Sequence, residues 1–401
     1  MINILNVQWD DNLQKLSFIT NRENIFDISF FIDGFPNLNK FIDNDVIFCD
    51  TIPDDKYTLI INHQNTEVIR SFLRKNKKLL DDTKIGKCRM IVTHIEGAVN
   101  NKGYSSGIGP GCWPDFLNSF EIPFSNFIVM TPELLLNGND KNLPITYKFF
   151  NRWAIIFESV KRNHHQLNLS VFNKTQRFSR LKYFYTVATS PRPHRIDLIN
   201  FLNKNNFLDK GHITMFNQVF DNDVYLSSKN IHSNSLGFNP DELIPLGKDL
   251  KSYNGISPTF AINDVKSMNS YYQIITASIY DEDVLSDKFH VFFNEKIWKS
   301  IITLNPFIFI GQYKTLECLR NMGFKTFNPF IDESYDDIKG WKNKKNVIFR
   351  EIKRLNSMSR KEIHDWYWNM KDILIHNYNR LSEYSDEQYD DFIKLLKEND
   401  N

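Results

Sequence analysis

The 401-residue chain lacks the patterns that mark disulfide-stapled secreted proteins, zinc proteins and strongly charged nucleic-acid binders. Its four cysteines, Cys49, Cys88, Cys112 and Cys318, are widely scattered, so they form neither a zinc-ligand spacing nor a disulfide framework. The 49 basic and 48 acidic side chains give a net charge of +1, which provides no global attraction for nucleic acid or an acidic membrane surface. We therefore expect a cytoplasmic protein with reduced thiols.

Long hydrophobic runs are also missing. No segment approaches the about 20 apolar residues that a membrane-spanning helix needs, so no membrane span is expected. The N-terminus, MINILNVQWDDN, has neither the basic flank nor the long apolar run of a signal peptide. The Gly-x-Ser-x-Gly pattern is absent and no cysteine has a persuasive histidine partner, so the sequence does not support a hydrolase.

Length and periodicity predict an α/β fold with two Rossmann-like domains. A chain of 401 residues is too long for one ordinary core. Short apolar runs alternate with helical spacing, which favours parallel sheets. Runs typical of strands occupy residues 45–50, 57–63, 88–97 and 127–133. The expected domains are residues 1–178 and 179–340, with C-terminal helices at 341–401.

The segment FHVFFNEKIWKSIITLNPFIFIG predicts a helix followed by a buried strand. Glu295 and Lys296 open a helix that should run to Thr303, and Pro306 prevents its continuation. The first helical turn has free backbone N–H groups and the positive end of the helix dipole, which attract an anion. Beside a parallel sheet, Glu295 can hold ribose hydroxyls and Lys296 can hold phosphates. This pairing predicts binding of a nucleotide sugar.

A second candidate site segment, YFYTVATSPRPHR, precedes the first by about a hundred residues. It predicts a strand from Tyr183, a Ser-Pro turn and then a helix over 196–203. Arg192 and Arg195 would lie at the carboxyl end of the strand, where open α/β sheets bind ligands. Their planar, permanently charged guanidinium groups suit a pyrophosphate. The alternative is that both arginines only cap and solvate a loop.

These segments resemble the donor-binding elements of alpha-1,3-fucosyltransferases. The first shares the aromatic residue, Glu-Lys, Trp and Pro-Phe-Ile pattern of that family, with Asn294 where the family usually has Thr. The second is similar to the family's strand followed by Ser and Arg. The endings Gly323–Phe327 and Asp332–Asp336 resemble uncharacterised phage and giant-virus relatives, so a viral origin is also expected. The resemblance covers about the second half of the chain.

The resemblance implies a GT-B-type fold and a glycosyltransferase activity. Residues 1–178 would then face the acceptor, 179–340 would bind the nucleotide sugar, and the C-terminal helices would pack back across both domains. The sugar would move to an acceptor hydroxyl by an inverting, metal-independent reaction. Arg195 and Lys296, assisted by Arg192, would stabilise the charge that develops on the leaving diphosphate.

An inverting transfer also requires a general base for the acceptor hydroxyl, and the N-terminal domain should supply it. Glu96 is the candidate because it ends the apolar strand CRMIVTHIE, where a carboxylate can face a cleft. His94 is the alternative base. Glu96 could equally cap the segment that follows the strand.

The acceptor is open at this stage: a glycan, a small hydroxyl compound or a hydroxymethylated DNA base. A DNA acceptor would need a basic stripe beside the cleft, because binding depends on phosphate contacts. Solvated helix and loop faces produce similar clusters of basic residues. The candidate stripe consists of Arg152, Lys161, Arg162, Lys174, Arg177, Arg180 and Lys182.

Two further interpretations remain. A non-catalytic structural or binding protein could retain a glycosyltransferase fold, although a charged site assembled from distant segments favours the enzyme. The Asp-x-Asp spacings at 221–223 and 281–283 could hold a divalent cation, but they lie in polar stretches typical of solvated turns, so no metal is expected. Neither the sugar nor the base of the donor follows from these residues.

Overall fold

The computed structural model describes residues 2–10, 15–18, 46–49, 51–62, 66–93, 112–135, 145–164, 169–188, 192–215, 265–277 and 290–398. The chain forms two compact units. Unit 1 comprises Met1–Ser159, Val284–Phe293 and Glu383–Asn401, and unit 2 comprises Val160–Asp283 and Asn294–Ser382. The functional domain limits expected from the sequence, near residues 178 and 340, stay predictions.

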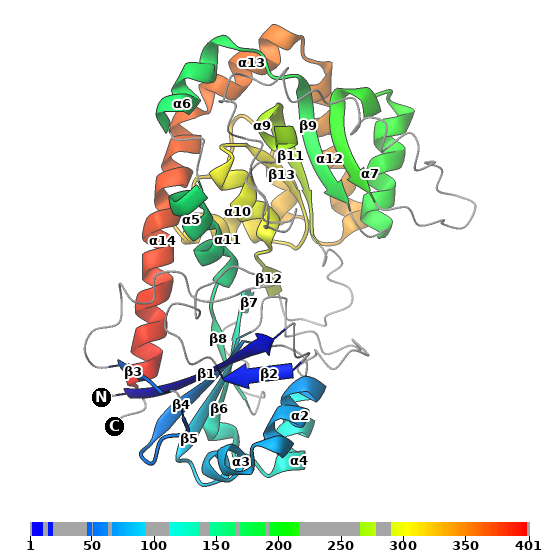
Figure 1. The fold of residues 1–401 in the computed structure, drawn as a ribbon. Coiled ribbons are helices and arrows are strands. Elements are labelled where there is room, and N and C mark those ends of the chain that lie inside the picture. Colours follow the sequence, from blue (N-terminus) through cyan, green and yellow to red (C-terminus); the bar gives the residue numbers. More distant parts are fainter. Residues whose placement is uncertain are drawn as a thin grey trace. The chain divides into compact units, whose positions relative to one another are not determined.

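Unit 1 is built on a mostly parallel sheet (Figure 1). Its strand order is β2-β1-β4-β5-β6-β8, with β3 also paired to β1, and only β2 is antiparallel to its neighbour. Strands such as FIVMT are buried throughout, as expected where a parallel sheet is covered on both faces. The strands are β1 (Ile2–Asp10), β2 (Lys15–Phe18), β3 (Val46–Phe48), β4 (Tyr57–Asn62), β5 (Cys88–Thr93), β6 (Phe127–Thr131) and β8 (Thr146–Phe149), with a separate antiparallel pair, β7 (Glu133–Leu135) and β12 (His290–Phe292).

Apolar cores lie on both faces of this sheet. Leu59 and Ile61 of β4 belong to one core, whereas Ile60 belongs to the other, because successive side chains of a strand point to opposite faces. The first core includes Phe72 from the helices that follow β4, and the second includes Phe392 from the C-terminal helix. The helical elements of unit 1 are α2 (Thr66–Lys75), α3 (Lys77–Lys84), α4 (Cys112–Phe120), η2 (Phe124–Asn126), most of α5 (Arg152–His164) and the second part of α14 (Lys371–Lys397).

Unit 2 contains a parallel sheet of order β10-β9-β11-β13. The crossover from β9 to β10 contains α7 (Pro193–Lys204), and that from β11 to β13 contains α10 (Glu295–Ile302). Because these crossovers leave in opposite directions, the topological switch point lies between β9 and β11, where such sheets bind ligands beyond the carboxyl ends of the strands. The strands are β9 (Lys182–Ala188), β10 (Gly211–Met215), β11 (Ser270–Thr276) and β13 (Phe307–Ile310).

Further helices surround the unit 2 sheet. Phe201 of α7 and Phe349 of α12 stack with ring centres 4.3 Å apart, so α12 packs beside α7. These elements confirm the predicted α/β fold class with two Rossmann-like domains and C-terminal helices. The remaining elements are α6 (Leu169–Lys174), η3 (Thr175–Arg177), η4 (Leu208–Lys210), α9 (Val265–Met268), α11 (Thr315–Asn321), η8 (Ser334–Asp337), α12 (Trp341–Ser357), α13 (Arg360–Asn369) and the first part of α14.

The acidic run Asp332–Asp336 has a structural role. The Glu333 carboxylate accepts a hydrogen bond from the Phe327 backbone at 2.6 Å. The Tyr335 hydroxyl accepts one from the backbone N–H of Phe309 on the edge strand β13, at 3.2 Å. The two carboxylate oxygens of Asp336 accept from the Leu316 and Glu317 backbone N–H groups at 3.0 Å each, so this aspartate caps α11 from a distant segment.

Replacing Asp336 by Ala is expected to lower the free energy of unfolding by about 1–3 kcal/mol, because one buried and one partly buried N–H group lose a charged acceptor. Urea unfolding would measure the change. The matched control is Asp337→Ala, since Asp337 is exposed and pairs only at the surface with Lys314. Equal losses in the two variants would contradict the proposed cap.

Candidate functional site

The first turn of α10 is organised as the sequence predicted. Asn294 is the N-cap residue, and its Oδ1 accepts a hydrogen bond from the Lys296 backbone N–H at 3.1 Å. Asparagine is among the best helix N-cap residues, so Asn294 is well suited to this position. The helix ends at Ile302, one residue before the predicted limit, and its apolar side chains, including Trp298, are buried. Burial of this face holds the N-terminus of α10 in place.

Glu295 and Lys296 contact each other directly. The Lys296 Nζ lies 2.5 Å from the Glu295 Oε1, and the two side chains are only 15% and 19% exposed. The sequence had assigned them to different parts of a ligand, phosphate for Lys296 and ribose for Glu295. A ligand that uses both groups must therefore exchange part of this ion pair for its own contacts.

Arg195 and His194 connect α7 to the carboxyl end of β11. The Arg195 Nη2 donates to the carbonyl oxygens of Thr276 and Ala277 at 3.2 and 3.3 Å, and the His194 Nε2 lies 3.0 Å from the Ala277 carbonyl oxygen. Both side chains are buried, Arg195 with 2% exposure. Arg195 is therefore not solvated, and its contacts with two backbone carbonyls also fit the alternative in which it caps a loop. Arg195 lies at the switch point of the sheet.

The helix that carries these residues begins earlier than predicted. The sequence placed its start at Ile196, whereas α7 begins at Pro193 with Arg192 as the N-cap residue. Proline favours the first position of a helix because its fixed φ suits the helix and its missing N–H would have no partner there. Arg195 thus belongs to the first turn of α7, and Arg192 precedes that turn.

Glu295 on one segment of the site affects the pKa of Arg195 on the other. Burial and, to a lesser extent, the like charge of Arg192 lower the pKa of Arg195 to about 10, against the opposing effect of Glu295. Burial also lowers the pKa of His194 to about 3, with a further contribution from Arg195, so this imidazole is neutral near pH 7. Among the described residues that the sequence assigned to the site, Arg192, Arg195 and Lys296 outnumber the carboxylate of Glu295, which favours an anionic ligand.

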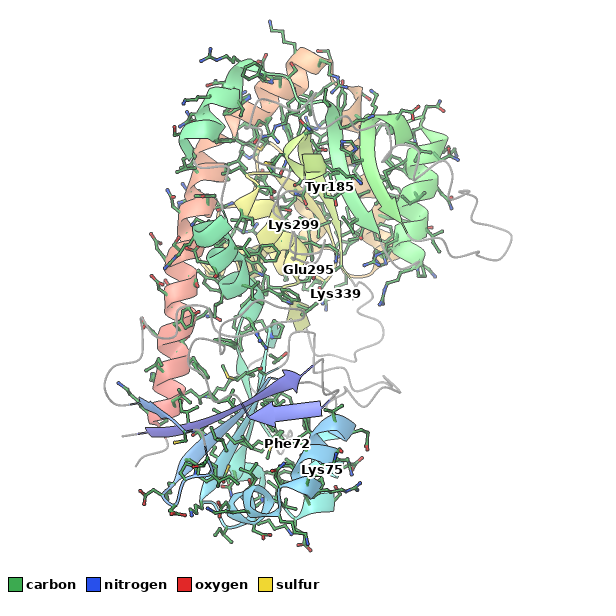
Figure 2. All side chains as sticks on the ribbon, viewed as in Figure 1. Phe72, Lys75, Tyr185, Glu295, Lys299 and Lys339 are labelled. Atoms are coloured by element: carbon green, nitrogen blue, oxygen red, sulfur yellow. The ribbon has the colours of Figure 1, made fainter. Side chains whose placement is uncertain are left out.

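Figure 2 places Glu295 beyond Lys299 in the direction in which the β9 arrow of Figure 1 points. The N-terminus of α10 therefore lies toward the carboxyl ends of the strands. Lys339 lies at the same end of unit 2, and its Nζ is 5.4 Å from the ring centre of Tyr313. Sequence reasoning missed Lys339 because no local pattern connects residues 313 and 339 with α10.

The candidate general bases Glu96 and His94 lie outside the described residues, as do the Asp-x-Asp spacings at 221–223 and 281–283. Their roles stay predictions. Within the described ranges, no three or more His, Cys, Asp or Glu side chains gather as metal ligands. None of the helices in that part of the chain combines the length and apolarity that a bilayer crossing requires.

The proposed basic stripe does not form as a continuous surface. Arg152, Lys161 and Arg180 are buried, and their cations bind groups inside the protein. For example, the Lys161 Nζ donates to the Tyr378 carbonyl oxygen at 2.7 Å, and the Arg180 Nη1 donates to the Ser270 carbonyl oxygen at 2.9 Å. The sequence suggested a stripe because it does not distinguish a buried cation with backbone acceptors from a solvated one.

Comparison with known proteins gives little further information. No family model matches the chain, and no curated protein matches it. A solved structure described as trehalose-6-phosphate from E. coli bound with UDP-2-fluoro glucose is similar with a TM-score of 0.42 and 10% sequence identity, over 86% of this chain and 74% of that one. The resemblance to alpha-1,3-fucosyltransferases and to viral relatives therefore stays a prediction.

Proposed function

We propose that this protein is a GT-B-type glycosyltransferase that binds a nucleotide-sugar donor at the carboxyl end of the unit 2 sheet. The observation that carries the proposal is the position of buried Arg195 at the switch point between β9 and β11, electrostatically coupled to Glu295 at the N-terminus of α10. This arrangement combines a ligand crevice, a helix N-terminus and a cluster of cations.

The chemistry of the site suits a sugar diphosphate. Arg192, Arg195 and Lys296 can bind the diphosphate and stabilise the negative charge that the leaving nucleotide gains in the transition state. The Glu295 carboxylate can accept hydrogen bonds from ribose hydroxyls. Because these cations can supply the stabilisation, we propose that the transfer needs no metal. We also propose that it inverts the anomeric centre, with Glu96 or His94 removing the proton from the acceptor hydroxyl.

A carbohydrate or another small hydroxyl compound is the favoured acceptor. The burial of Arg152, Lys161 and Arg180 removes three of the seven basic residues that a DNA acceptor would require at the surface. The alternative, a non-catalytic binding protein on the same fold, predicts no selective response to nucleotide sugars.

A thermal-shift panel separates these two functions, because a ligand that binds only the folded state raises the apparent stability. The panel would contain UDP, GDP and ADP together with UDP-glucose, GDP-mannose and ADP-glucose. Selective stabilisation by one nucleotide family, followed by sugar release or transfer, is the expected result. No response to any of these compounds would contradict the proposed donor site.

Replacing Lys296 by Ala is expected to weaken binding of the selected nucleoside diphosphate about 10- to 150-fold, as a charge-assisted contact is worth roughly 1.5–3 kcal/mol. The loss of Lys296 also leaves the Glu295 carboxylate without its 2.5 Å ion-pair partner, so repulsion adds to the effect. Calorimetric titration would measure the affinity. Lys353→Ala, which removes an exposed lysine from α12, controls for the change in net charge. Equal affinities in both variants would exclude Lys296 from the site.

A further inference from the structure

Gln312 is a buried amide that makes no hydrogen bond within the described residues. Its side chain is 3% exposed, and neither Nε2 nor Oε1 has a partner there. Its backbone, in contrast, is held firmly: the Thr315 hydroxyl donates to the Gln312 carbonyl oxygen at 3.0 Å, and the Lys344 Nζ donates to the preceding carbonyl of Gly311 at 3.1 Å. The fold thus fixes the position of Gln312 but leaves its amide unsatisfied.

The Gln312 backbone lies at the same edge of the sheet as the segment that Arg195 contacts. The Ala277 backbone N–H donates to the Ile310 carbonyl oxygen at 2.8 Å, so Ala277 and Gly311 continue the β11–β13 pairing beyond the strands. Ala277 is also the residue whose carbonyl accepts from Arg195. A Cβ atom at Gly311 would lie 3.0 Å from the Ala277 Cβ, which shows how close the two segments are. Gln312 follows directly, one residue beyond this contact.

Asn294, the N-cap residue of α10, supplies a second amide with an unsatisfied atom. Its Oδ1 caps α10, whereas its Nδ2 has no partner in the described part of the chain, although the residue is only 1% exposed. Buried polar groups without partners destabilise a fold and are rare in native proteins. A ligand bound between the segments that carry these two amides would complete their hydrogen bonds.

The unsatisfied atoms restrict the ligand to groups that both donate and accept hydrogen bonds. A phosphate only accepts hydrogen bonds and an ammonium group only donates them, so neither could satisfy both ends of the Gln312 amide. Neighbouring hydroxyls of a sugar ring can donate to Oε1 and accept from Nε2. We propose that Gln312, together with Asn294, forms a subsite for the sugar-ring hydroxyls of the bound nucleotide sugar. This inference rests on the proposed donor site, and the sugar ring is either the transferred sugar or the ribose.

The test is Gln312→Met, which preserves the approximate size of the side chain and removes both polar atoms. The variant is expected to unfold at a higher temperature than the wild type without ligand, because an unsatisfied amide is lost. Its affinity for the selected nucleotide sugar is expected to fall about tenfold. A structural role would give the opposite stability change, so a lower unfolding temperature would overturn the proposal.

Gln273→Met provides the matched control. Gln273 is also a buried glutamine of the unit 2 sheet, but its amide bonds to Ser267, Thr303 and Ser300. The same substitution there should lower the unfolding temperature, since it leaves three hydroxyl groups with fewer partners. A rise at Gln312 with a fall at Gln273 would support the subsite.

Comparison of ligands identifies the ring and separates this inference from the proposed function. Loss of affinity for UDP-glucose, GDP-mannose or ADP-glucose, with unchanged binding of the parent diphosphate, would assign Gln312 to the transferred sugar. Alternatively, the variant loses affinity equally for the nucleotide sugar and for the parent diphosphate. If wild type and variant then bind the 2′,3′-dideoxy diphosphate equally well, Gln312 is assigned to the ribose. An equal loss of affinity that is also seen with the dideoxy diphosphate, or no loss of affinity for any ligand, would contradict the subsite without contradicting the donor site. If the wild type binds none of these nucleotides, the proposed function itself fails.

Discussion

Acidification below pH 6.5 is expected to destabilise the protein through His194, by roughly 4–5 kcal/mol if carried to pH 3. The folded protein holds this imidazole neutral, with a pKa lowered to about 3 by burial and by Arg195 and Arg192, whereas the unfolded chain has the ordinary value near 6.5. Between these two values the unfolded state binds a proton that the folded state does not. The contribution of His194 to the free energy of unfolding is therefore fully present above pH 6.5 and is lost as the pH falls toward 3.

The measurement compares urea unfolding of the wild type and His194→Gln between pH 7 and 4.5. Glutamine can still donate to the Ala277 carbonyl that lies 3.0 Å from the His194 Nε2, but it does not titrate. The free energy of unfolding of the wild type, relative to that of His194→Gln, should fall by roughly 2–3 kcal/mol over this range. Each pH unit below 6.5 contributes about 1.4 kcal/mol. His376→Gln, at a partly exposed histidine of α14, controls for the loss of an imidazole. Parallel pH profiles of wild type and His194→Gln would refute the assignment.

Glu96→Gln is expected to abolish transfer while sparing donor binding. Glutamine preserves the shape of the side chain and one acceptor oxygen but cannot take a proton, so only deprotonation of the acceptor should suffer. General-base catalysis typically contributes about a hundred- to ten-thousandfold to the rate, which is larger than the effect of a modest packing defect. The described part of β5 ends at Thr93, three residues before Glu96, at the carboxyl edge of the unit 1 sheet.

Turnover and donor affinity would both be measured on the purified Glu96→Gln protein. Glu67→Gln, at an exposed carboxylate of α2, is the control for a lost negative charge in unit 1. Turnover within a few fold of the wild type would eliminate Glu96 as the base. His94→Gln would then be the next variant to assay, because His94 follows the same strand.

The general architecture and the first turn of α10 were predictable because their signals are local. Apolar runs such as FIFI and FIVMT indicate buried parallel strands by themselves. The Asn-Glu-Lys start of α10 depends on a cap between residues two positions apart. The start of α7 was placed three residues late because Pro193 was interpreted as part of a turn rather than as the first helical residue.

Contacts between distant segments were decided by the tertiary structure. Arg195 and Thr276 are 81 positions apart, and only the order of the strands brings them together at the switch point. The same holds for Asp336, which caps α11 from 20 positions away, and for Lys161, whose buried ammonium group binds a carbonyl 217 positions away. The sequence by itself determined the apolar strands, the start of α10 and the balance of charge, because these depend on neighbouring residues. Packing between distant segments decides which cations are buried, which amides lack partners and which strand ends meet. Local periodicity does not determine that packing.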